Sequence, residues 1–419
     1  MGFASAWLEK NALFPAVINE APDTQTGIIV VVPAFNEPGI IPLLNSLKDC
    51  SPPDCKTEVI IVINAPADPP AEIIRNNQVC YKNIESWKKV NHSCFLRLHV
   101  FETGNHGIRN WGVGLARKAG MDEAIRRFNS IDNPGGIISS LDADCTVESN
   151  YFTEICKTLV KNESRKACSV YFEHPLSGDN FPDIVYTHIT QYELHLRYYL
   201  QCLIYSGFPY AFHTVGSAMA CKASVYVKAG GMNRKQAGED FYFIQKLVPL
   251  GGYFSLNSTT VYPSPRGSLR VPFGTGATMS RMMTNDEKYL LTYNINAFRE
   301  LRVLFRNVTD YFKLGSQDLD NYYNTLPPGI RSFLNAKEWK NRITEIQKNT
   351  AGEEAFRKRF FGWFNMFRIV KYLNNVHAGI FEKQMVEVSA REFLNLAGRN
   401  FESDDPGKLL ILFRQLEKM

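Results

Sequence analysis

The stretch Gly136-Ile137-Ile138-Ser139-Ser140-Leu141-Asp142-Ala143-Asp144 joins an apolar run to two carboxylates that stand one residue apart. Residues 136–141 predict a buried β-strand, because a short apolar run bounded by polar residues is typical of a strand covered on both faces. Asp142 and Asp144 then lie at the rim of a sheet. Mg²⁺ usually binds one or two carboxylates together with substrate phosphates. The motif predicts a cation site for a nucleoside diphosphate, and the alternative is a simple turn, in which aspartate is also favoured.

Two apolar runs upstream extend this strand into a repeating β/α order. Residues 27–32 (Gly-Ile-Ile-Val-Val-Val) and residues 59–63 (Val-Ile-Ile-Val-Ile) predict strands in the middle of a parallel sheet. A helix predicted over 40–47 lies between them, which makes a βαβ unit. A third strand over 95–101 and a long helix over 111–128 precede the strand that ends in the two aspartates. This alternation predicts a doubly wound α/β sheet.

The predicted helix over 111–128 carries small residues on one side, which allow a close approach to another element. These residues are Gly112, Gly114, Ala116, Ala119 and Gly120.

The second half of the chain has a looser pattern. The expected elements are a strand over 168–172, an aromatic-rich helix over 184–205, a glycine-punctuated segment over 216–231, a helix that begins at Gly238-Glu239-Asp240, and a mobile loop over 264–277. Beyond Met279 the pattern predicts mainly helices. We therefore expect an N-terminal arm over 1–26, an α/β domain over 27–278 with an insertion at about 67–98, and a helical region over 279–419.

Composition and charge limit the class of protein. The 419 residues are 45% hydrophobic and 21% charged, which is ordinary for a soluble globular protein. A net charge of +5 permits an anionic substrate, but no basic stripe suggests a nucleic-acid partner. Nine cysteines without a CxxC pair are typical of reduced thiols in a cytosolic protein. We find no secretory signal and no apolar run near the roughly 18–20 residues of a membrane span, so we expect a cytoplasmic protein.

Polar residues follow three of the predicted strands. They are Pro33-Ala34-Phe35-Asn36-Glu37, Asn64 and Asp142-Ala143-Asp144. Ligands of α/β sheets bind outside the carboxyl ends of the strands, so we expect all three groups on one rim. Taken alone, Asn36 or Glu37 is equally well explained as a cap of the helix that follows.

Glu239 and Asp240 stand at the start of a predicted helix. Acidic residues favour the positive end of the helix dipole, which is the structural explanation. The functional explanation is a general base, which needs first to lie within hydrogen-bond reach of a substrate hydroxyl and then to have a suitable pKa.

Together these residues resemble the inverting glycosyltransferases of family 2, which have the nucleotide-sugar-binding fold called GT-A. The matching segments are Val30-Val31-Val32-Pro33-Ala34-Phe35-Asn36-Glu37, Gly114-Leu115-Ala116-Arg117-Lys118-Ala119-Gly120, Leu141-Asp142-Ala143-Asp144, Gly230-Gly231-Met232 and Gly238-Glu239-Asp240-Phe241-Tyr242-Phe243. The resemblance covers roughly residues 27–275. Each segment alone is a weak motif, but five in the right order are a specific signal.

The resemblance implies a Rossmann-like mixed sheet and a set of donor-binding residues. The residues that would line the base, ribose or diphosphate of the donor are Pro33, Ala34, Phe35, Glu37, Asn64, Arg117 and Asp142.

The resemblance also implies catalytic and metal-binding roles. Asp144, with Asp142 beside it, would bind Mg²⁺ or Mn²⁺ on the diphosphate. Asp240, the second member of the acid pair with Glu239, would deprotonate the acceptor hydroxyl. The sugar would be a hexose, and the acceptor a saccharide, a lipid-linked molecule or a small molecule.

The chain departs from the family pattern at two places. Asn64 stands where the second strand of the family usually ends in an aspartate that holds the base, which puts the nucleobase preference in doubt. Related enzymes often supply a late histidine as a metal ligand, but the only histidine after Asp240 is His377, far along the helical region. The metal would then rest on Asp144, phosphates and water.

Two arginines lie in the predicted loop over 264–277. Arginine matches phosphate geometry with a fork of donors, so Arg266 and Arg270 are candidates to close on the diphosphate. The alternative is that both are ordinary surface residues.

The helical region contains a basic aromatic stretch over 356–372. Its bulky residues recur at helical spacing, which is compatible with a helix lying on an anionic membrane at the inner face. A stripe of this kind is more often packed in a core, with basic stems spread around it.

The sequence thus favours a metal-dependent inverting glycosyltransferase. Two alternatives stay open. One is a nucleotide-sugar-binding protein without catalysis. The other is a sugar-phosphate nucleotidyltransferase, although Pro33-Ala34-Phe35-Asn36-Glu37 is not the glycine-rich phosphate loop of that class.

Overall fold

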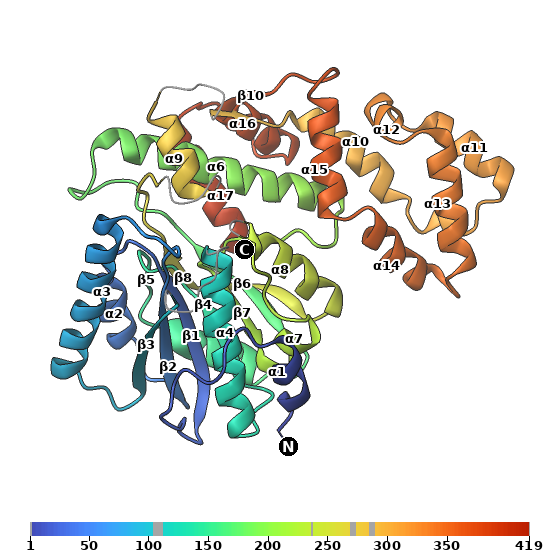
Figure 1. The fold of residues 1–419 in the computed structure, drawn as a ribbon. Helices are drawn as coiled ribbons and strands as arrows, with labels where there is room; N and C mark the ends of the chain where they lie inside the picture. The colour runs from blue at the N-terminus through green and yellow to red at the C-terminus, as the bar shows by residue number, and fades with distance from the viewer. Residues whose placement is uncertain (1, 104–111, 236–237, 269–273, 285–289, 419) are drawn as a thin grey trace. The chain divides into compact units, whose positions relative to one another are not determined.

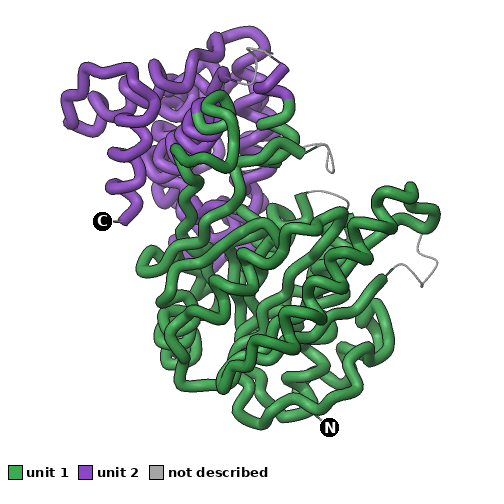
Figure 2. Tube along the Cα trace, turned by 90° about the vertical axis from the view of Figure 1, so that its left-hand side faces the viewer, with its two compact units in different colours: residues 1–186, 214–280 green, residues 187–213, 281–419 purple. Residues whose placement is uncertain are grey.

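The structure, a computed structural model, describes residues 2–103, 112–235, 238–268, 274–284 and 290–418. It divides into two compact units, which Figure 2 shows in different colours. The first unit contains residues 1–186 and 214–280, and the second contains residues 187–213 and 281–419. Residues 187–213 therefore group with the C-terminal helices, which nothing in the sequence pattern indicated.

A mixed sheet of eight strands forms the centre of the first unit (Figure 1). The strands are β1 (Thr26–Ala34), β2 (Lys56–Ile63), β3 (Leu96–Glu102), β4 (Ile137–Ser140), β5 (Thr146–Val147), β6 (Ala167–Phe172), β7 (Met219–Lys222) and β8 (Tyr253–Tyr262). Their order is β3-β2-β1-β4-β7-β6-β8-β5. The pairs among β3, β2, β1 and β4 are parallel, as is β6 with β8, whereas β7 is antiparallel to both its neighbours and β5 to β8. The predicted α/β architecture with a Rossmann-like mixed sheet is confirmed.

Strand β1 lies between two parallel neighbours, which explains its continuous apolar sequence. Residues 28–32 are fully buried. Val31 aligns with Ser140 of β4, and Ala34 aligns with Ile63 of β2. The chain therefore leaves β1, β2 and β4 on one edge of the sheet.

The first unit also contains helices, not all of which the sequence indicated. They are α1 (Ser5–Asn11), α2 (Ile41–Lys48), α3 (Ala71–Val90), α4 (Val113–Ser130), α5 (Tyr151–Ile155), α7 (Ala223–Lys228) and α8 (Glu239–Leu247), while α6 (Asp183–Ser206) and α9 (Thr275–Met282) begin in the first unit and end in the second. The predicted insertion near 67–98 is largely helix α3. The loop predicted over 264–277 is corrected at its end, because α9 already begins at Thr275.

Helix α4 packs directly on the sheet through its small residues, as its sequence predicted. A Cβ added to Gly120 would lie 2.5 Å from Cγ1 of Val31 and 2.9 Å from Cγ2 of Val62. Such distances leave no room for a larger residue. The close contact between α4 and the strands β1 and β2 brings the first turn of the helix to the strand ends.

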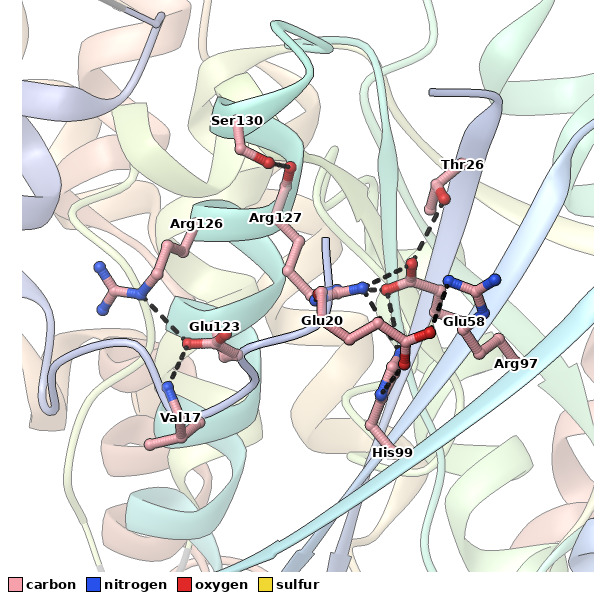
Figure 3. A network of polar contacts seen from close by, with 10 residues as sticks. All are labelled: Val17, Glu20, Thr26, Glu58, Arg97, His99, Glu123, Arg126, Arg127 and Ser130. Carbon is pink, nitrogen blue, oxygen red and sulfur yellow. Dashed lines mark hydrogen bonds and ion pairs between the residues drawn. The ribbon is translucent and has the colours of Figure 1, made fainter. Parts of the chain in front are cut away.

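The N-terminal arm is tied to the sheet by a network of ion pairs (Figure 3). Arg127 of α4 pairs with Glu58 of β2, and its Nη1 donates to the backbone oxygen of Glu20 at 2.7 Å. Glu20 also pairs with Arg97 at 3.2 Å. His99 of β3 lies among these charges, with Nε2 3.9 Å from Glu58. Burial lowers the pKa of His99 to about 4, and the charge of Arg127 acts in the same direction.

We expect His99 to make the protein less stable in acid. An unfolded histidine titrates near 6.5 (about the model-peptide value), so the unfolded chain binds more protons than the folded one between that pH and about 4. Stability therefore falls as the pH is lowered through this window, by about 2 kcal/mol between pH 7 and pH 5 for this group. Urea unfolding at both pH values should show that loss reduced in His99→Gln.

The exposed His92 supplies a matched control, because His92→Gln removes a histidine that faces solvent in the same unit. Equal pH dependence in His99→Gln, His92→Gln and the wild type would contradict the expectation.

The second unit is mainly helical, as predicted. Its elements, apart from the end of α6 and of α9, are α10 (Ile295–Arg306), α11 (Ser316–Thr325), α12 (Pro328–Phe333), α13 (Ala336–Lys348), α14 (Glu353–Trp363), α15 (Met366–Val376), α16 (Val386–Leu396), α17 (Pro406–Lys418) and the small sheet of β9 (Leu291–Thr292) with β10 (Gln384–Met385).

The basic aromatic stretch over 356–372 forms two helices rather than one. The helical backbone stops at Phe364, and the side chain of Asn365 caps α15 by accepting from the N–H of Arg368. Phe356, Phe360 and Phe364 are fully buried. This burial favours packing of the stretch in the protein core over a helix that lies on a membrane surface.

The described residues contain no helix that is long and apolar enough to cross a membrane. All nine cysteines are free thiols in the structure.

Candidate active site

The polar residues that follow β1, β2 and β4 meet at one edge of the sheet, as predicted. The backbone N–H of Asn64 donates to the oxygen of Ala34 at 2.8 Å, which joins the ends of β2 and β1. The side chain of Arg266 contacts both Glu37 and Asp144, which joins the segments after β1 and β4.

The turn after β1 is held by two asparagines of α3. Asn36 has a positive φ of 51°, in the left-handed region that asparagine tolerates better than most residues. Its N–H donates to Oδ1 of Asn77 at 3.0 Å, and its Oδ1 accepts from Nδ2 of Asn76 at 2.7 Å. This bracing fixes the direction of Glu37, which is 3% exposed. The predicted insertion is thus part of the site's support.

Asn64 acts as a structural brace in this arrangement. Its Nδ2 donates to the oxygen of Gly112 at 3.0 Å, and its Oδ1 accepts from Oγ1 of Thr103 at 2.8 Å. Both functional groups of the side chain therefore have partners within the protein. Contact with a nucleobase, which the resemblance implied, stays a prediction.

Pro33, Ala34 and Phe35 lead from β1 into the turn. Ala34 is buried, whereas Pro33 and Phe35 are half-buried. The backbone here reaches the rim where a donor would lie, and the roles predicted for these residues stay predictions.

Arg117, near the start of α4, is the buried centre of the first charge cluster. Its guanidinium donates to Asp142 and Glu239 and, through Nε, to Oγ of Ser140 at 3.2 Å. Arg117 is 3% exposed. Burial alone would lower the pKa of Arg117, but the charges of Asp142 and Glu239 outweigh it and raise the pKa. Arg117 thus joins the strand-end motif to the acid pair at the start of α8.

Gly216 packs against this guanidinium, a role that the sequence analysis missed because the only local signal was a glycine-punctuated segment. A Cβ at Gly216 would lie 2.5 Å from Nη1 and 2.7 Å from Cζ of Arg117. Its backbone N–H also hydrogen-bonds to the carboxylate of Asp240. A glycine is needed here because the backbone itself covers the arginine.

Glu239 and Asp240 lie in different surroundings although they are adjacent. Glu239 is 2% exposed and paired with Arg117. Burial raises the pKa of Glu239 to about 7 against the opposing charge of Arg117. Asp240 is half-buried, and its Oδ1 accepts from the N–H of Phe241 at 2.7 Å. Burial also raises the pKa of Asp240, again against Arg117.

These surroundings give the two acids different chemical uses. Glu239 is enclosed by protein and holds Arg117 in place. Asp240 is less buried than Glu239 and has a raised pKa, which suit a group that accepts a proton from a substrate.

Arg266 is the centre of the second charge cluster. Its Nη2 contacts Glu37 and lies 2.9 Å from Oδ2 of Asp144, while Nε donates to the same Oδ2 at 2.9 Å and Nη1 to Oε1 of Glu37 at 3.2 Å. The Arg266 side chain is 29% exposed and that of Asp144 27%. Arg270, the other arginine predicted to contact the donor, lies outside the described residues.

Acidic groups outnumber basic groups in these two clusters. The described residues contribute five carboxylates, those of Glu37, Asp142, Asp144, Glu239 and Asp240, against the guanidinium groups of Arg117 and Arg266. An anionic diphosphate would meet net repulsion here unless a cation accompanied it. No group of three His, Cys, Asp or Glu side chains in the described part of the chain is arranged to hold a metal ion.

The carboxylate oxygens of these clusters nevertheless fit a hard cation that also takes phosphate oxygens. Mg²⁺ needs only one or two protein carboxylates in such sites. Asp144 and Glu37 offer them at one point, since both reach the same nitrogen of Arg266.

No protein-family model matches the chain, and no curated protein matches its sequence. Among solved structures, the chain is similar to S. aureus TarS 1-349 in complex with UDP-GlcNAc, with 14% identity over 79% of this chain and 91% of that one and a TM-score of 0.42. It is similar to the mannosyltransferase PcManGT from Pyrobaculum calidifontis in complex with GDP-Man and Mn²⁺, with 14% identity over 99% of this chain and 93% of that one and a TM-score of 0.38. A third similar structure is glucosyl-3-phosphoglycerate synthase from Mycobacterium tuberculosis in complex with Mn²⁺, UDP and phosphoglyceric acid, with 13% identity over 56% of this chain and 70% of that one and a TM-score of 0.31.

Proposed function

We propose that this protein is a metal-assisted, inverting glycosyltransferase that moves a hexose from a nucleoside-diphosphate donor to an acceptor hydroxyl. One observation carries the proposal. Arg117 joins the first aspartate of the strand-end motif to the acid pair at the start of α8, so that Asp142 and Asp240 belong to one site.

Asp240 is the base of the proposed reaction. Its carboxylate takes the proton from the acceptor hydroxyl as the acceptor oxygen attacks the anomeric carbon. The bond from that carbon to the diphosphate oxygen breaks on the opposite face, which inverts the configuration. The N–H groups of Phe241 and Gly216 hold the Asp240 carboxylate in place during this transfer.

The proposed reaction leaves a nucleoside diphosphate that gains negative charge. Mg²⁺ or Mn²⁺, held at Asp144, would supply the positive charge that stabilises this leaving group. Arg266 contacts Asp144 and Glu37 and carries a fork of donors suited to phosphate oxygens. Arg117 is enclosed by Asp142, Glu239 and Gly216, so its role is to position the carboxylates rather than to touch the donor.

The alternative of a nucleotide-sugar-binding protein without catalysis is weaker on chemical grounds. A protein that only bound a nucleotide sugar would not need a half-buried carboxylate of raised pKa beside the donor site. A cytoplasmic location and peripheral contact with a membrane stay predictions, and so does the class of acceptor.

A panel of nucleoside diphosphates, each with and without Mn²⁺, tests the proposal by thermal shift. A ligand that binds only the folded state at 100 times its Kd stabilises that state by about 2.7 kcal/mol. We expect one nucleobase to raise the Tm by several degrees, and Mn²⁺ to increase that shift. If no nucleoside diphosphate changes the Tm under either condition, the proposed function is wrong.

A further inference from the structure

We infer that Arg266 and a divalent cation compete for Glu37 and Asp144, so that Arg266 is the internal counter-ion of the donor-free protein. The inference rests on the proposed function and names the pair of carboxylates that the cation takes. It also assigns Arg266 two successive partners, first the carboxylates and then the diphosphate.

The geometry around Arg266 points to one shared position. A single nitrogen, Nη2, contacts a carboxylate oxygen of Glu37 and one of Asp144. Two carboxylate oxygens from the segments after β1 and β4 therefore converge on one point. A positive charge occupies that point already, in the form of the guanidinium.

A hard cation satisfies the same two oxygens when the guanidinium leaves. Mg²⁺ takes oxygen ligands at roughly 2.0–2.1 Å and keeps waters or phosphate oxygens at its remaining positions. The Glu37 side chain is only 4% exposed. A buried carboxylate needs a compensating charge, so Arg266 can leave only as another cation arrives.

Burial distinguishes this pair from the cluster around Arg117. The Arg266 side chain is 29% exposed, and its loop position lets it leave without opening the core. The Arg117 side chain is 3% exposed and fixed among Asp142, Glu239 and Gly216. We therefore place the cation at Asp144 and Glu37, and assign Asp142 to holding Arg117.

Arg266 and the cation exclude each other in this inference. Removal of Arg266 must therefore strengthen cation binding by the coupling free energy between the two. Coupling between linked sites typically changes the affinity by about 5–150-fold. Removal of Arg266 should at the same time weaken diphosphate binding, because a guanidinium fork is lost. A residue with a merely structural role would weaken both.

Titration with Mn²⁺ alone, followed by the electron paramagnetic resonance signal of unbound Mn²⁺, tests the inference without nucleotide or turnover. We expect Arg266→Ala to bind Mn²⁺ at least about tenfold more tightly than the wild type. The double variant Arg266→Ala/Asp144→Asn should lose this gain. Arg97→Ala is the matched control, because it removes an arginine that pairs with an acid, Glu20, elsewhere in the same unit. It should bind Mn²⁺ as the wild type does.

Two outcomes would overturn the inference. One is equal Mn²⁺ affinity, or no Mn²⁺ binding, in Arg266→Ala and the wild type. The other is a gain that persists in the double variant, since the cation would then lie elsewhere. Binding of UDP or GDP by the wild type is measured separately and tests the proposed function. The titration with Mn²⁺ alone tests the inference about Arg266, whatever the outcome of the nucleotide measurement.

Discussion

An Asp240→Asn variant is expected to bind the nucleotide-sugar donor normally and to transfer the sugar about 10²–10⁴ times more slowly than the wild type, the usual contribution of a general base. The substitution keeps an oxygen that can accept from the N–H of Phe241, so the start of α8 should remain folded. It removes only the ability to take a proton from the acceptor. Initial rates under saturating donor, together with donor Kd from calorimetry, separate these two effects.

The pH dependence of the wild-type rate provides a second test of Asp240 as the base. Burial raises the pKa of Asp240 above its usual value, so the protonated, inactive form persists to a higher pH than for an exposed aspartate. The acidic limb of kcat/KM should therefore lie above about 4, the ordinary aspartate value. Asp54→Asn is a suitable control, because Asp54 is an exposed aspartate of the same unit. Normal transfer by Asp240→Asn would exclude Asp240 as the base.

Arg117→Met is expected to destabilise the protein by about 3–5 kcal/mol, the usual cost of leaving a buried charge without its partner. Methionine fills much of the volume of the side chain but leaves Asp142 and Glu239 without a counter-ion. Urea unfolding measures the loss. Activity should fall as well, because Asp240 and Asp142 lose the charge that connects them.

The same substitution at Arg266 supplies the comparison. Arg266 pairs with two acids as Arg117 does, but its side chain is 29% exposed instead of 3%. Arg266→Met should cost less stability, because a cation from solution can reach Glu37 and Asp144 and replace the lost charge. If Arg117→Met does not fold, Arg117→Lys tests the idea with the charge retained, and we expect it to fall between the wild type and the loss predicted for methionine. Equal costs at Arg117 and Arg266 would contradict the assigned role of burial.

Much of the fold could be predicted from local sequence. The apolar runs at 27–32, 59–63 and 136–141 are strands because they are short, continuous and bounded by residues that end a strand. Helix α4 carries Gly120 where it meets Val31 and Val62, so even a close contact was visible as a row of small residues.

The placement of residues 187–213 in the second unit was not visible in the sequence. Their hydrophobic pattern predicts a helix, but it does not predict which other elements the helix packs against. The division of residues 356–372 into two helices was also not visible in the sequence. The aromatic residues keep a regular helical spacing across the break, which the cap of Asn365 on α15 creates.

The sequence by itself determined which residue types stand at the ends of the strands: Glu37 after β1, Asn64 after β2, and Asp142 and Asp144 after β4. These follow from strand boundaries, which are local. Only the tertiary structure decided how the charges pair. Arg117 takes Asp142 and Glu239, whereas Arg266 takes Glu37 and Asp144. The physical reason is that the strength of an ion pair depends on distance and burial, and both are set by how distant segments fold together.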